Sequence, residues 1–276
     1  MASAKLFRVD GLVALITGGG SGLGRMMAHA LASNGAHKVY IFGRREDKLK
    51  QAAEGHDNII PIQGDALDKD ALQAAAERVK AEVGYLNVLI VNSGATGPIA
   101  KLPPSGSIGD LQEHFWSYST DEINHVFALN NTAAFFTLVA FLELLHAGNE
   151  KKNRPDIQSS VIFTASIAGY ARALATGVAY IPSKAATIQS TKMYSTLLAK
   201  WNIRVNAIAP GMYPSEMTES ILGNPKLLET IPAHRYGTEE DMQGLILFLT
   251  SRAGAYINGD VLITDGGRLS QMPASY

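Results

Sequence analysis

The chain has 276 residues, of which 46% are hydrophobic, with a formal net charge of −1 at pH 7 and no cysteine. Without cysteine, disulfides, thiolate catalysis and cysteine metal sites are excluded, and the balanced charge provides no basic stripe for nucleic acid or an anionic membrane surface. The seven histidines show no spacing backed by carboxylates, so we predict no metal site. There is no signal-like N-terminus and no apolar run of about 18 residues. We therefore expect a cytoplasmic protein.

In the first half of the chain, short apolar runs alternate with helical patterns. A helical stretch begins near Leu23, after a glycine-rich turn. Short apolar runs bounded by turn residues are typical of buried parallel strands. The predicted strands span residues 12–16, 38–42, 58–62 and 86–91, and the predicted helices span 46–54 and 68–83.

The second half continues this alternation, with helices predicted at 122–146, 179–200 and 238–250 and strands at 159–163, 203–208 and 260–264. Strands that alternate with helices predict a parallel sheet with right-handed crossovers. We therefore expect a single α/β domain over residues 1–276. Its fold would be a Rossmann-like, doubly wound parallel sheet of about seven strands with helices on both faces.

Three segments interrupt the alternation, at residues 96–120, 167–178 and 211–235. In an open parallel sheet, ligands bind at the carboxyl ends of the strands, and these segments emerge near that edge. We therefore expect them to form the walls of a substrate pocket. Their large apolar residues fit either a roomy pocket or core and subunit contacts, and they are Phe115, Trp116, Tyr213, Met217, Ile221 and Leu222.

The turn from Thr17 to Gly24 connects a predicted strand to a predicted helix. Free backbone amides and the helix dipole at such a point favour a dinucleotide diphosphate, although a plain strand–helix turn reads similarly. The glycines follow the pattern Gly18-x-x-x-Gly22-x-Gly24 rather than strict Gly-x-Gly-x-x-Gly.

Cofactor choice depends on the end of the second strand, where an acidic residue would accept a hydrogen bond from the ribose 2′-hydroxyl. The chain instead reads Gly43-Arg44-Arg45. Arginine can bind a 2′-phosphate through its charged fork, so we predict NADP rather than NAD, with Arg44 favoured. The alternative is a solvated helix start in which the arginines pair with Glu46 or Asp47.

Tyr180 and Lys184 lie four residues apart on a predicted helix, where side chains share a face. A nearby ammonium would lower the tyrosine pKa from roughly 10. Alone, this pair is more often a helix surface, but the fifth predicted strand ends at Ser166 and places a hydroxyl at the same sheet edge. Ser166 lacks a nucleophile elbow and would instead hydrogen-bond a substrate carbonyl.

Together these motifs resemble the classical short-chain dehydrogenase/reductase family over residues 11–267. The resemblance rests on several spaced motifs in order: the Thr17–Gly24 turn, Asp65, Asn92-Ser93-Gly94, Asn130, Ser166, Tyr180, Lys184, Pro210-Gly211 and Asp265-Gly266-Gly267.

The resemblance implies four catalytic residues. Tyr180 would exchange the proton, and Lys184 would lower its pKa and hold the nicotinamide ribose. Ser166 would orient the carbonyl. Asn130 would keep a water in a proton relay behind Lys184.

The resemblance also implies the cofactor contacts. Asp65 would contact adenine, Pro210 and Gly211 would border the nicotinamide, and Ser215 would replace a threonine that binds the cofactor amide. The full predicted set for NADP(H) is Gly18, Ser21, Gly22, Leu23, Gly24, Arg44, Arg45, Asp65, Ala66, Asn92, Gly94, Tyr180, Lys184, Pro210, Gly211 and Ser215.

The sequence therefore predicts an NADPH-dependent carbonyl reductase of an apolar ketone, such as a 3-oxoacyl, polyketide-like, steroid-like or secondary-metabolite ketone. The alternatives are an NAD(P)-dependent secondary alcohol dehydrogenase, a non-catalytic NADP-binding regulator, and a family member recruited to dehydration or cyclisation. The resemblance also implies a homodimer or homotetramer built on helices 122–146 and 179–200 and the segment 257–268, with no nucleic-acid or membrane partner.

Overall fold

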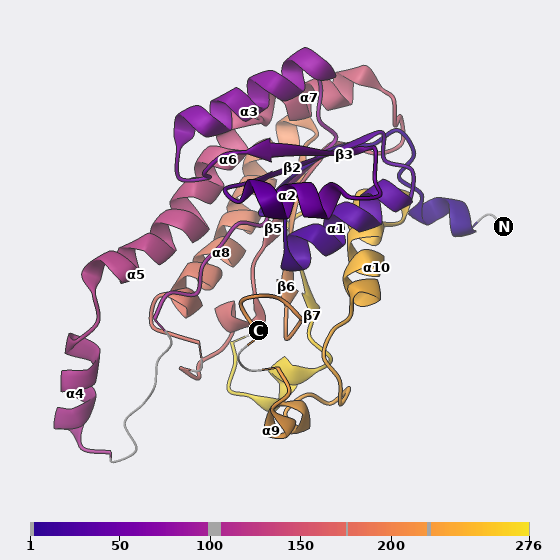
Figure 1. Ribbon diagram of the computed structural model, residues 1–276. Coiled ribbons are helices and arrows are strands. Elements are labelled where there is room, and N and C mark those ends of the chain that lie inside the picture. The colour runs from indigo at the N-terminus through magenta and orange to yellow at the C-terminus, as the bar shows by residue number, and fades with distance from the viewer. Residues whose placement is uncertain (1–2, 99–105, 175, 220–221, 276) are drawn as a thin grey trace.

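The computed structural model describes residues 3–98, 106–174, 176–219 and 222–275. At its centre is one seven-stranded parallel sheet with the order β3-β2-β1-β4-β5-β6-β7 (Figure 1). This confirms the predicted Rossmann-like fold class. The strands are β1 Val13–Thr17, β2 Lys38–Gly43, β3 Ile59–Gln63, β4 Val88–Val91, β5 Ser160–Thr164, β6 Arg204–Pro210 and β7 Val261–Thr264.

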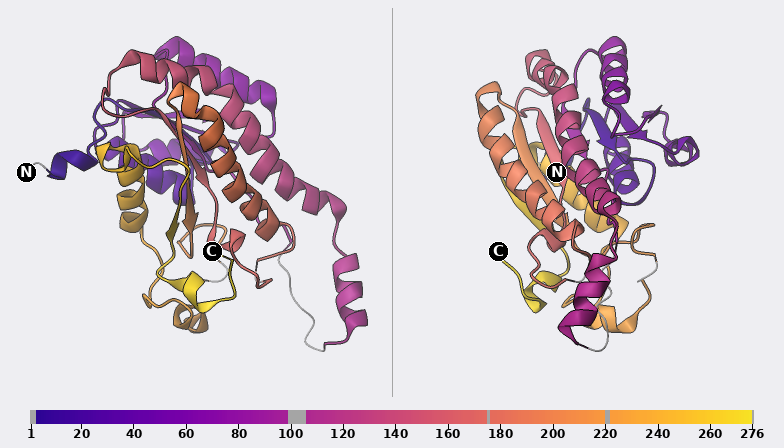
Figure 2. Two further views of the ribbon diagram at one scale, coloured as in Figure 1. Left: turned by 180° about the vertical axis from the view of Figure 1, so that it is seen from behind. Right: turned by 90° about the vertical axis from the view of Figure 1, so that its left-hand side faces the viewer.

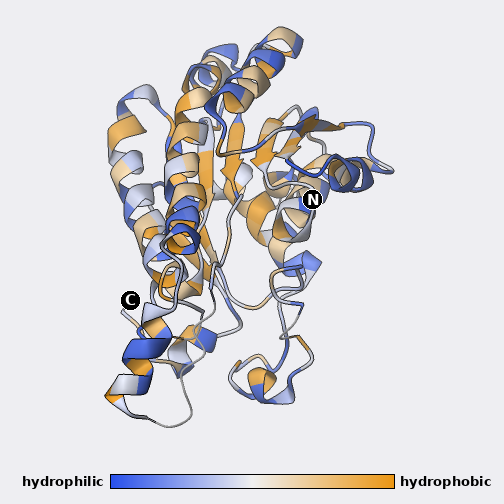
Figure 3. Cartoon of the chain, turned by 60° about the vertical axis from the view of Figure 1, so that its left-hand side comes forward, coloured by the Kyte–Doolittle hydropathy of each residue, from blue (hydrophilic) through white to orange (hydrophobic). Residues whose placement is uncertain are grey.

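The strands are apolar because most of them are covered on both faces. Every residue of β1, β4 and β6 is buried, and the centre of the sheet is predominantly hydrophobic (Figure 3). Pro61 lies in β3, at the edge of the sheet, where its missing amide hydrogen removes no inner ladder bond.

Helices cover both faces of the sheet, and alternate strand residues pack against each layer. On one face, α1 (Gly22–Ser33), α2 (Glu46–Ala53) and α10 (Glu239–Thr250) pack on residues such as Ala14 and Ile16. The other face carries α3 (Lys69–Glu82), α6 (Ala134–Ala140), α7 (Leu142–Lys151) and α8 (Tyr180–Leu198).

The helix predicted at 122–146 is not continuous. It is divided into α5 (Thr120–Phe127), a π-helical segment η2 (Ala128–Ala133), α6 and α7, and the axis bends by 44° at the break between Ala140 and Leu142. A π-helical turn accommodates one extra residue within a helix, so a helix predicted from its overall apolar pattern does not show where such a turn lies. Such turns are frequent at functional sites, and η2 contains Asn130.

The predicted substrate wall at 96–120 reaches the cleft through Thr96. It contains the helix α4 (Ile108–Trp116), which buries no residue and projects away from the body (Figure 2), and Trp116 is 87% exposed. Residues 99–105 lie outside the described ranges. A short helix α9 (Pro225–Glu229) lies in the predicted wall at 211–235.

The segment after β5 is joined to the C-terminal tail. The amide of Arg172 donates to the carbonyl of Pro273 at 2.8 Å, and Ala171 and Ala274 form an antiparallel bridge. Two stretches far apart in sequence therefore lie side by side beyond the carboxyl ends of β5 and β7.

None of the single helices in the described part of the chain is long and apolar enough to cross a bilayer. The two helical stretches Thr120–Ala140 and Leu142–Lys151, which are bent by 44° at their junction, together have the length and composition of a membrane span.

Two glycines in helices differ in how closely their surroundings are packed. A Cβ at Gly148 in α7 would lie 2.2 Å from the Leu86 carbonyl oxygen, whereas one at Gly244 in α10 would meet nothing within 4 Å. Gly148→Ala should therefore destabilise the protein by about 1–3 kcal/mol through overpacking. Gly244→Ala should stabilise it by about 0.5–1 kcal/mol, since alanine loses less backbone entropy in a helix. Urea denaturation of both variants measures the two effects, and a stabilised Gly148→Ala variant would contradict this packing.

Candidate active site

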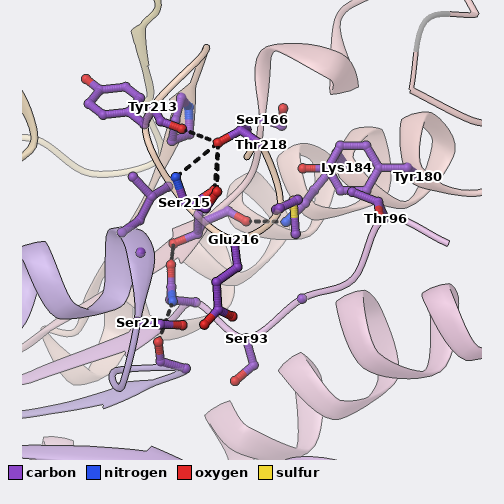
Figure 4. A pocket seen from close by; sticks show the side chains of 18 of the residues that line it. Ser21, Ser93, Thr96, Ser166, Tyr180, Lys184, Tyr213, Ser215, Glu216 and Thr218 are labelled. Carbon is purple, nitrogen blue, oxygen red and sulfur yellow. Dashed lines mark hydrogen bonds between the residues drawn. The ribbon is translucent and has the colours of Figure 1, made fainter. Parts of the chain in front are cut away.

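A cleft of about 670 Å³ lies at the carboxyl ends of the strands. Every predicted cofactor residue except Gly24 lines it, and so does Ser166 (Figure 4). Asn130 does not reach it. The residues that sequence reasoning grouped from seven separate segments are thus brought to one site.

The glycines of the Thr17–Gly24 turn serve two purposes. Gly18 and Gly22 have positive φ values of 67° and 49°, a backbone conformation that L side chains rarely adopt. Gly24 is required sterically, because its Cβ would lie 2.1 Å from the Gly18 carbonyl oxygen. The departure from strict Gly-x-Gly-x-x-Gly spacing therefore still gives a closed turn in front of α1.

The turn delivers the N-terminus of α1 to the cleft. Ser21 is the N-cap residue, but its side chain makes no capping hydrogen bond. The first turn of α1 also contains no acidic residue. First-turn amides with the positive end of the helix dipole form an anion site, which matches the predicted place of a diphosphate.

A hydrogen-bond network holds the ends of β1, β4 and β5 together. The Thr17 hydroxyl accepts from the amides of Asn92 and Ser93 at 3.0 and 3.2 Å. The Asn92 side chain donates to the Thr17 carbonyl at 3.1 Å and accepts from the Thr164 hydroxyl at 3.1 Å. Asn92 therefore shapes the floor of the cleft. Thr17 and Thr164 were not predicted as site residues, although each is the last strand residue before a predicted site segment.

Asn130 stands behind the cleft and is fully engaged by protein groups. Its amide nitrogen donates to the Ala95 carbonyl and to the Ser183 hydroxyl, both at 2.9 Å, and its Oδ1 accepts from the Ala95 amide at 2.8 Å. Since both amide hydrogens are used, the side-chain nitrogen is not free to donate to a relay water. The Asn130 side chain thus joins the backbone after β4 to α8, and its part in a proton relay stays a prediction.

Ser166, Tyr180 and Lys184 converge in the cleft. Ser166 follows β5 and accepts from the Ala168 amide at 3.1 Å. Tyr180 opens α8 and is hydrogen-bonded to Ser166. The Lys184 ammonium donates to the Thr164 carbonyl at 2.7 Å and lies 5.6 Å from the centre of the Tyr180 ring. The predicted i, i+4 face is thus present.

Burial sets the charge state of this pair. The side chains of Tyr180 and Lys184 are 8% and 5% exposed. Burial lowers the pKa of Lys184 to about 8. It also raises the pKa of Tyr180, and a hydrogen bond from Ser166 opposes that rise. Loss of water disfavours the phenolate and the ammonium alike, so burial leaves the pKa of Tyr180 above its ordinary value rather than below it, as the sequence had led us to expect.

The two arginines after β2 differ in their partners. Arg45 makes a two-pronged contact with Glu216 at 3.0 and 2.7 Å and also donates to the Ser21 hydroxyl at 3.2 Å. Within the described part of the chain, the exposed Arg44 guanidinium makes no hydrogen bond or ion pair. Of the two arginines, Arg44 is therefore the one whose guanidinium no described side chain occupies, and its contact with a cofactor phosphate stays a prediction. The Glu216 pair was not foreseen, since 171 residues separate the partners.

Ser215 lies over the glycine turn rather than beside Pro210. Its Cβ is 3.1 Å from the position that a Cβ on Gly22 would take. The Thr218 hydroxyl closes a tight turn with the Tyr213 carbonyl at 2.6 Å and the Ser215 amide at 3.0 Å (Figure 4). In this arrangement Ser215 faces the proposed diphosphate end, so the predicted contact with the cofactor amide does not follow from its position.

The predicted apolar pocket residues are divided. Tyr213 and Met217 line the cleft, whereas Phe115, Trp116 and Leu222 do not, and Ile221 lies outside the described residues. Among the described residues, no group of three or more histidine, aspartate or glutamate side chains could hold a metal ion.

Comparison with known proteins identifies the family. A family model described as short chain dehydrogenase matches residues 12–225. The chain is 44% identical over its full length to the short-chain dehydrogenase/reductase PhomF of Diaporthe leptostromiformis, covering 97% of that protein. It is 33% identical to the rhamnolipids biosynthesis 3-oxoacyl-[acyl-carrier-protein] reductase of Pseudomonas aeruginosa, with 95% and 97% of the two chains covered.

A solved structure agrees with these relatives. The Pseudomonas aeruginosa RhlG/NADP active-site complex is similar with a TM-score of 0.83 and 30% identity, covering 96% of this chain and 99% of that one. The chain therefore belongs to the short-chain dehydrogenase family and is an oxidoreductase that acts on CH–OH or C=O groups.

The buried ammonium makes stability depend on pH. Between pH about 8 and the ordinary lysine value of 10.5, the unfolded chain binds a proton at Lys184 that the folded chain has lost. The free energy of unfolding should therefore rise with pH across this window, by at most about 1.4 kcal/mol per pH unit from this group. Methionine at position 184 does not titrate, so the free energy of unfolding of Lys184→Met should lack that rise. The wild type should therefore gain stability relative to Lys184→Met between pH 8 and 10. Urea denaturation at several pH values tests this, and parallel pH profiles would contradict it.

Proposed function

We propose that the protein is an NADPH-dependent carbonyl reductase of a mainly apolar ketone. The observation that carries the proposal is the convergence of Ser166, Tyr180 and Lys184 on the cleft that the glycine turn and Arg44 also line. The first three residues supply a hydrogen bond, a proton and a buried cation at one point. The turn and Arg44 supply sites for a diphosphate and a 2′-phosphate.

The residues present fit a phosphorylated dinucleotide. Gly18 and Gly22 leave the approach to α1 free of side chains, and the Arg44 guanidinium has no protein partner among the described residues. A guanidinium fork is suited to a phosphate. The resemblance to a structure described as an NADP complex supports the same choice. Asp65 and Ala66 line the end of the cleft next to β3, where adenine would bind.

The chain's own residues divide the proton chemistry. When bound, the reduced nicotinamide supplies the hydride for the carbonyl carbon. Ser166 donates a hydrogen bond to the carbonyl oxygen and stabilises its developing charge. Tyr180 gives its proton to the same oxygen. Burial raises the pKa of Tyr180, so the phenol is protonated at neutral pH and ready to act as the acid. Lys184 then stabilises the phenolate that remains.

The lining beyond Ser166 supports an apolar substrate. Leu129, Ile167, Met212, Met217 and Met272 all border the cleft. A ketone on an extended apolar body fits this lining, and a relative is described as a 3-oxoacyl reductase. We accordingly place 3-oxoacyl and polyketide-like ketones among the first substrates to test.

The proposed enzyme is a homodimer or homotetramer. Apolar side chains are exposed on the outer sides of α6 and α8: Phe135 is 42%, Val139 44%, Met193 53% and Leu197 54% exposed. Large exposed apolar side chains gathered on two helices are typical of protein–protein contacts. It supports pairing through the two helical regions predicted from the sequence.

Tyr180→Phe tests the catalytic assignment. The variant keeps the ring and loses the proton donor, so ketone reduction should fall by about 10²–10⁴-fold, while NADPH binding stays within about twofold because the cleft keeps its shape. Steady-state kinetics and nicotinamide fluorescence measure the two quantities. Tyr194→Phe, another buried tyrosine on α8, is the matched control and should retain activity. Near-normal turnover by Tyr180→Phe would overturn the proposed chemistry.

Arg44→Ala tests cofactor choice. A lost contact between a guanidinium and a phosphate costs about 1.5–3 kcal/mol, so the Kd for NADPH should rise by about 10–100-fold. The Kd for NADH should change little. Separate fluorescence titrations with the two cofactors give both constants. Arg252→Ala, an exposed arginine paired with Asp156 at 3.8 Å, serves as the control. Tighter NADH than NADPH binding in the wild type would overturn the NADPH proposal and favour alcohol oxidation.

A further inference from the structure

Arg268 is a cation that lines the cleft and forms no ion pair with the described residues. It begins the short helix η6 (Arg268–Gln271) after β7, and it lines the cleft together with Met272. Its Nη1 is buried without a hydrogen-bond partner, and within the described ranges its guanidinium joins no ion pair. A buried, unpaired guanidinium nitrogen is costly, so this arrangement indicates a missing acceptor.

The groups around Arg268 do not supply that acceptor. Asp265 is nearby and favours the charged guanidinium, but its carboxylate is used by the amides of Gly267 at 2.8 Å and Leu269 at 2.7 Å. Tyr236 is the other titratable neighbour, and its own hydroxyl is also buried without a partner. Arginine cannot be deprotonated in a protein, so the positive charge persists in the cleft.

Thr176 adds a second unsatisfied group to the same wall. Its Oγ1 is buried and has no hydrogen-bond partner among the described residues, and Thr176 lines the cleft. It belongs to the segment that pairs with the C-terminal tail through Arg172 and Pro273. Arg268 and Thr176 both line the cleft, on two segments that are joined through Arg172 and Pro273.

The proposed cofactor does not account for Arg268. In the sheet order β3-β2-β1-β4-β5-β6-β7, Arg44 follows β2, the diphosphate turn follows β1 and Arg268 follows β7. Ser166, at the reacting carbonyl, follows β5 and lies between them. The 2′-phosphate and the diphosphate are thus assigned to the opposite half of the cleft, so an anion bound by Arg268 would belong to the substrate.

We propose that Arg268, assisted by Thr176, binds a carboxylate carried by the ketone substrate. This inference rests on the proposed reductase function and narrows its substrate class to oxo acids with an apolar body. A carboxylate fits because a guanidinium fork matches its two oxygens and because one cation balances one negative charge. A phosphate group carries about −1.5 to −2 at neutral pH and would be left partly uncompensated against this apolar lining.

Matched acid and ester substrates test the subsite. The pairs are 4-acetylbenzoate and 7-oxooctanoate, each against its methyl ester, with NADPH consumption as the readout. The wild type should show a KM for each acid about tenfold or more below that of its ester, since a charge-assisted contact is worth about 1.5–3 kcal/mol. Arg268→Met should raise the KM for the acids about tenfold, with the ester KM and the NADPH Kd unchanged. Thr176→Val should shift the acids in the same direction by a smaller factor.

Arg172→Met is the matched control, because Arg172 is an exposed arginine on the same wall segment that does not line the cleft. It should leave all four KM values unchanged. Equal KM values for acids and esters in the wild type, or equal changes for both in Arg268→Met, would overturn the subsite. A large loss of NADPH affinity in Arg268→Met would overturn it too, by assigning the arginine to the cofactor.

A thermal shift without cofactor separates this inference from the reductase proposal. 4-Acetylbenzoate should raise the Tm of the wild type more than that of Arg268→Met, since a ligand that binds the folded state stabilises it. An Arg268-dependent shift without NADPH consumption would uphold the subsite and overturn the reductase. Reduction of the esters, with no lower KM for the acids and no Arg268-dependent rise in Tm, would uphold the reductase and overturn the subsite.

Discussion

The site depends on one constraint, the hydrogen-bonded junction of three central strand ends. Asn92 at the end of β4 binds Thr17 of β1 and Thr164 of β5, and the Thr164 carbonyl accepts the Lys184 ammonium. The glycine turn closes on the same group, because a Cβ at Gly24 would lie 2.8 Å from the Asn92 amide nitrogen. The cofactor half and the proton-transfer half of the cleft therefore share one rigid floor, which is what a reaction between two bound molecules requires.

That floor holds two groups whose charged forms are disfavoured by burial. Lys184 has a pKa of about 8, and the pKa of Tyr180 is raised. Perturbed values of this kind are common at sites that transfer protons. A raised pKa keeps the Tyr180 phenol neutral at neutral pH, and a pKa of about 8 leaves Lys184 mostly charged there. In the proposed reaction, the Lys184 ammonium stabilises the negative charge that develops on the Tyr180 oxygen. Before the reaction, burial disfavours the charged form of Lys184.

Sequence pattern was sufficient for the fold and for the centre of the site. The seven apolar runs lie within one or two residues of the observed strands, because a strand covered on both faces must be apolar throughout. Ser166, Tyr180 and Lys184 were placed together because strand ends of a parallel sheet share one edge. The π-helical turn around Asn130 was missed because an overall apolar pattern does not show where such a turn lies. The position of α4 was missed because an amphipathic pattern does not say whether a partner surface exists.

Contacts between distant segments set the ends of the cleft, and local pattern carries little information about them. The Arg45–Glu216 pair and the joining of Arg172 to Pro273 both bring together stretches about 100 residues or more apart. The family model matches residues 12–225, so the C-terminal tail that bears Arg268 lies beyond the matched region. The shared chemistry is thus encoded in strand ends, where neighbours follow from the topology. The proposed carboxylate subsite lies instead on the tail and on the segment against which it folds, outside the junction at Asn92.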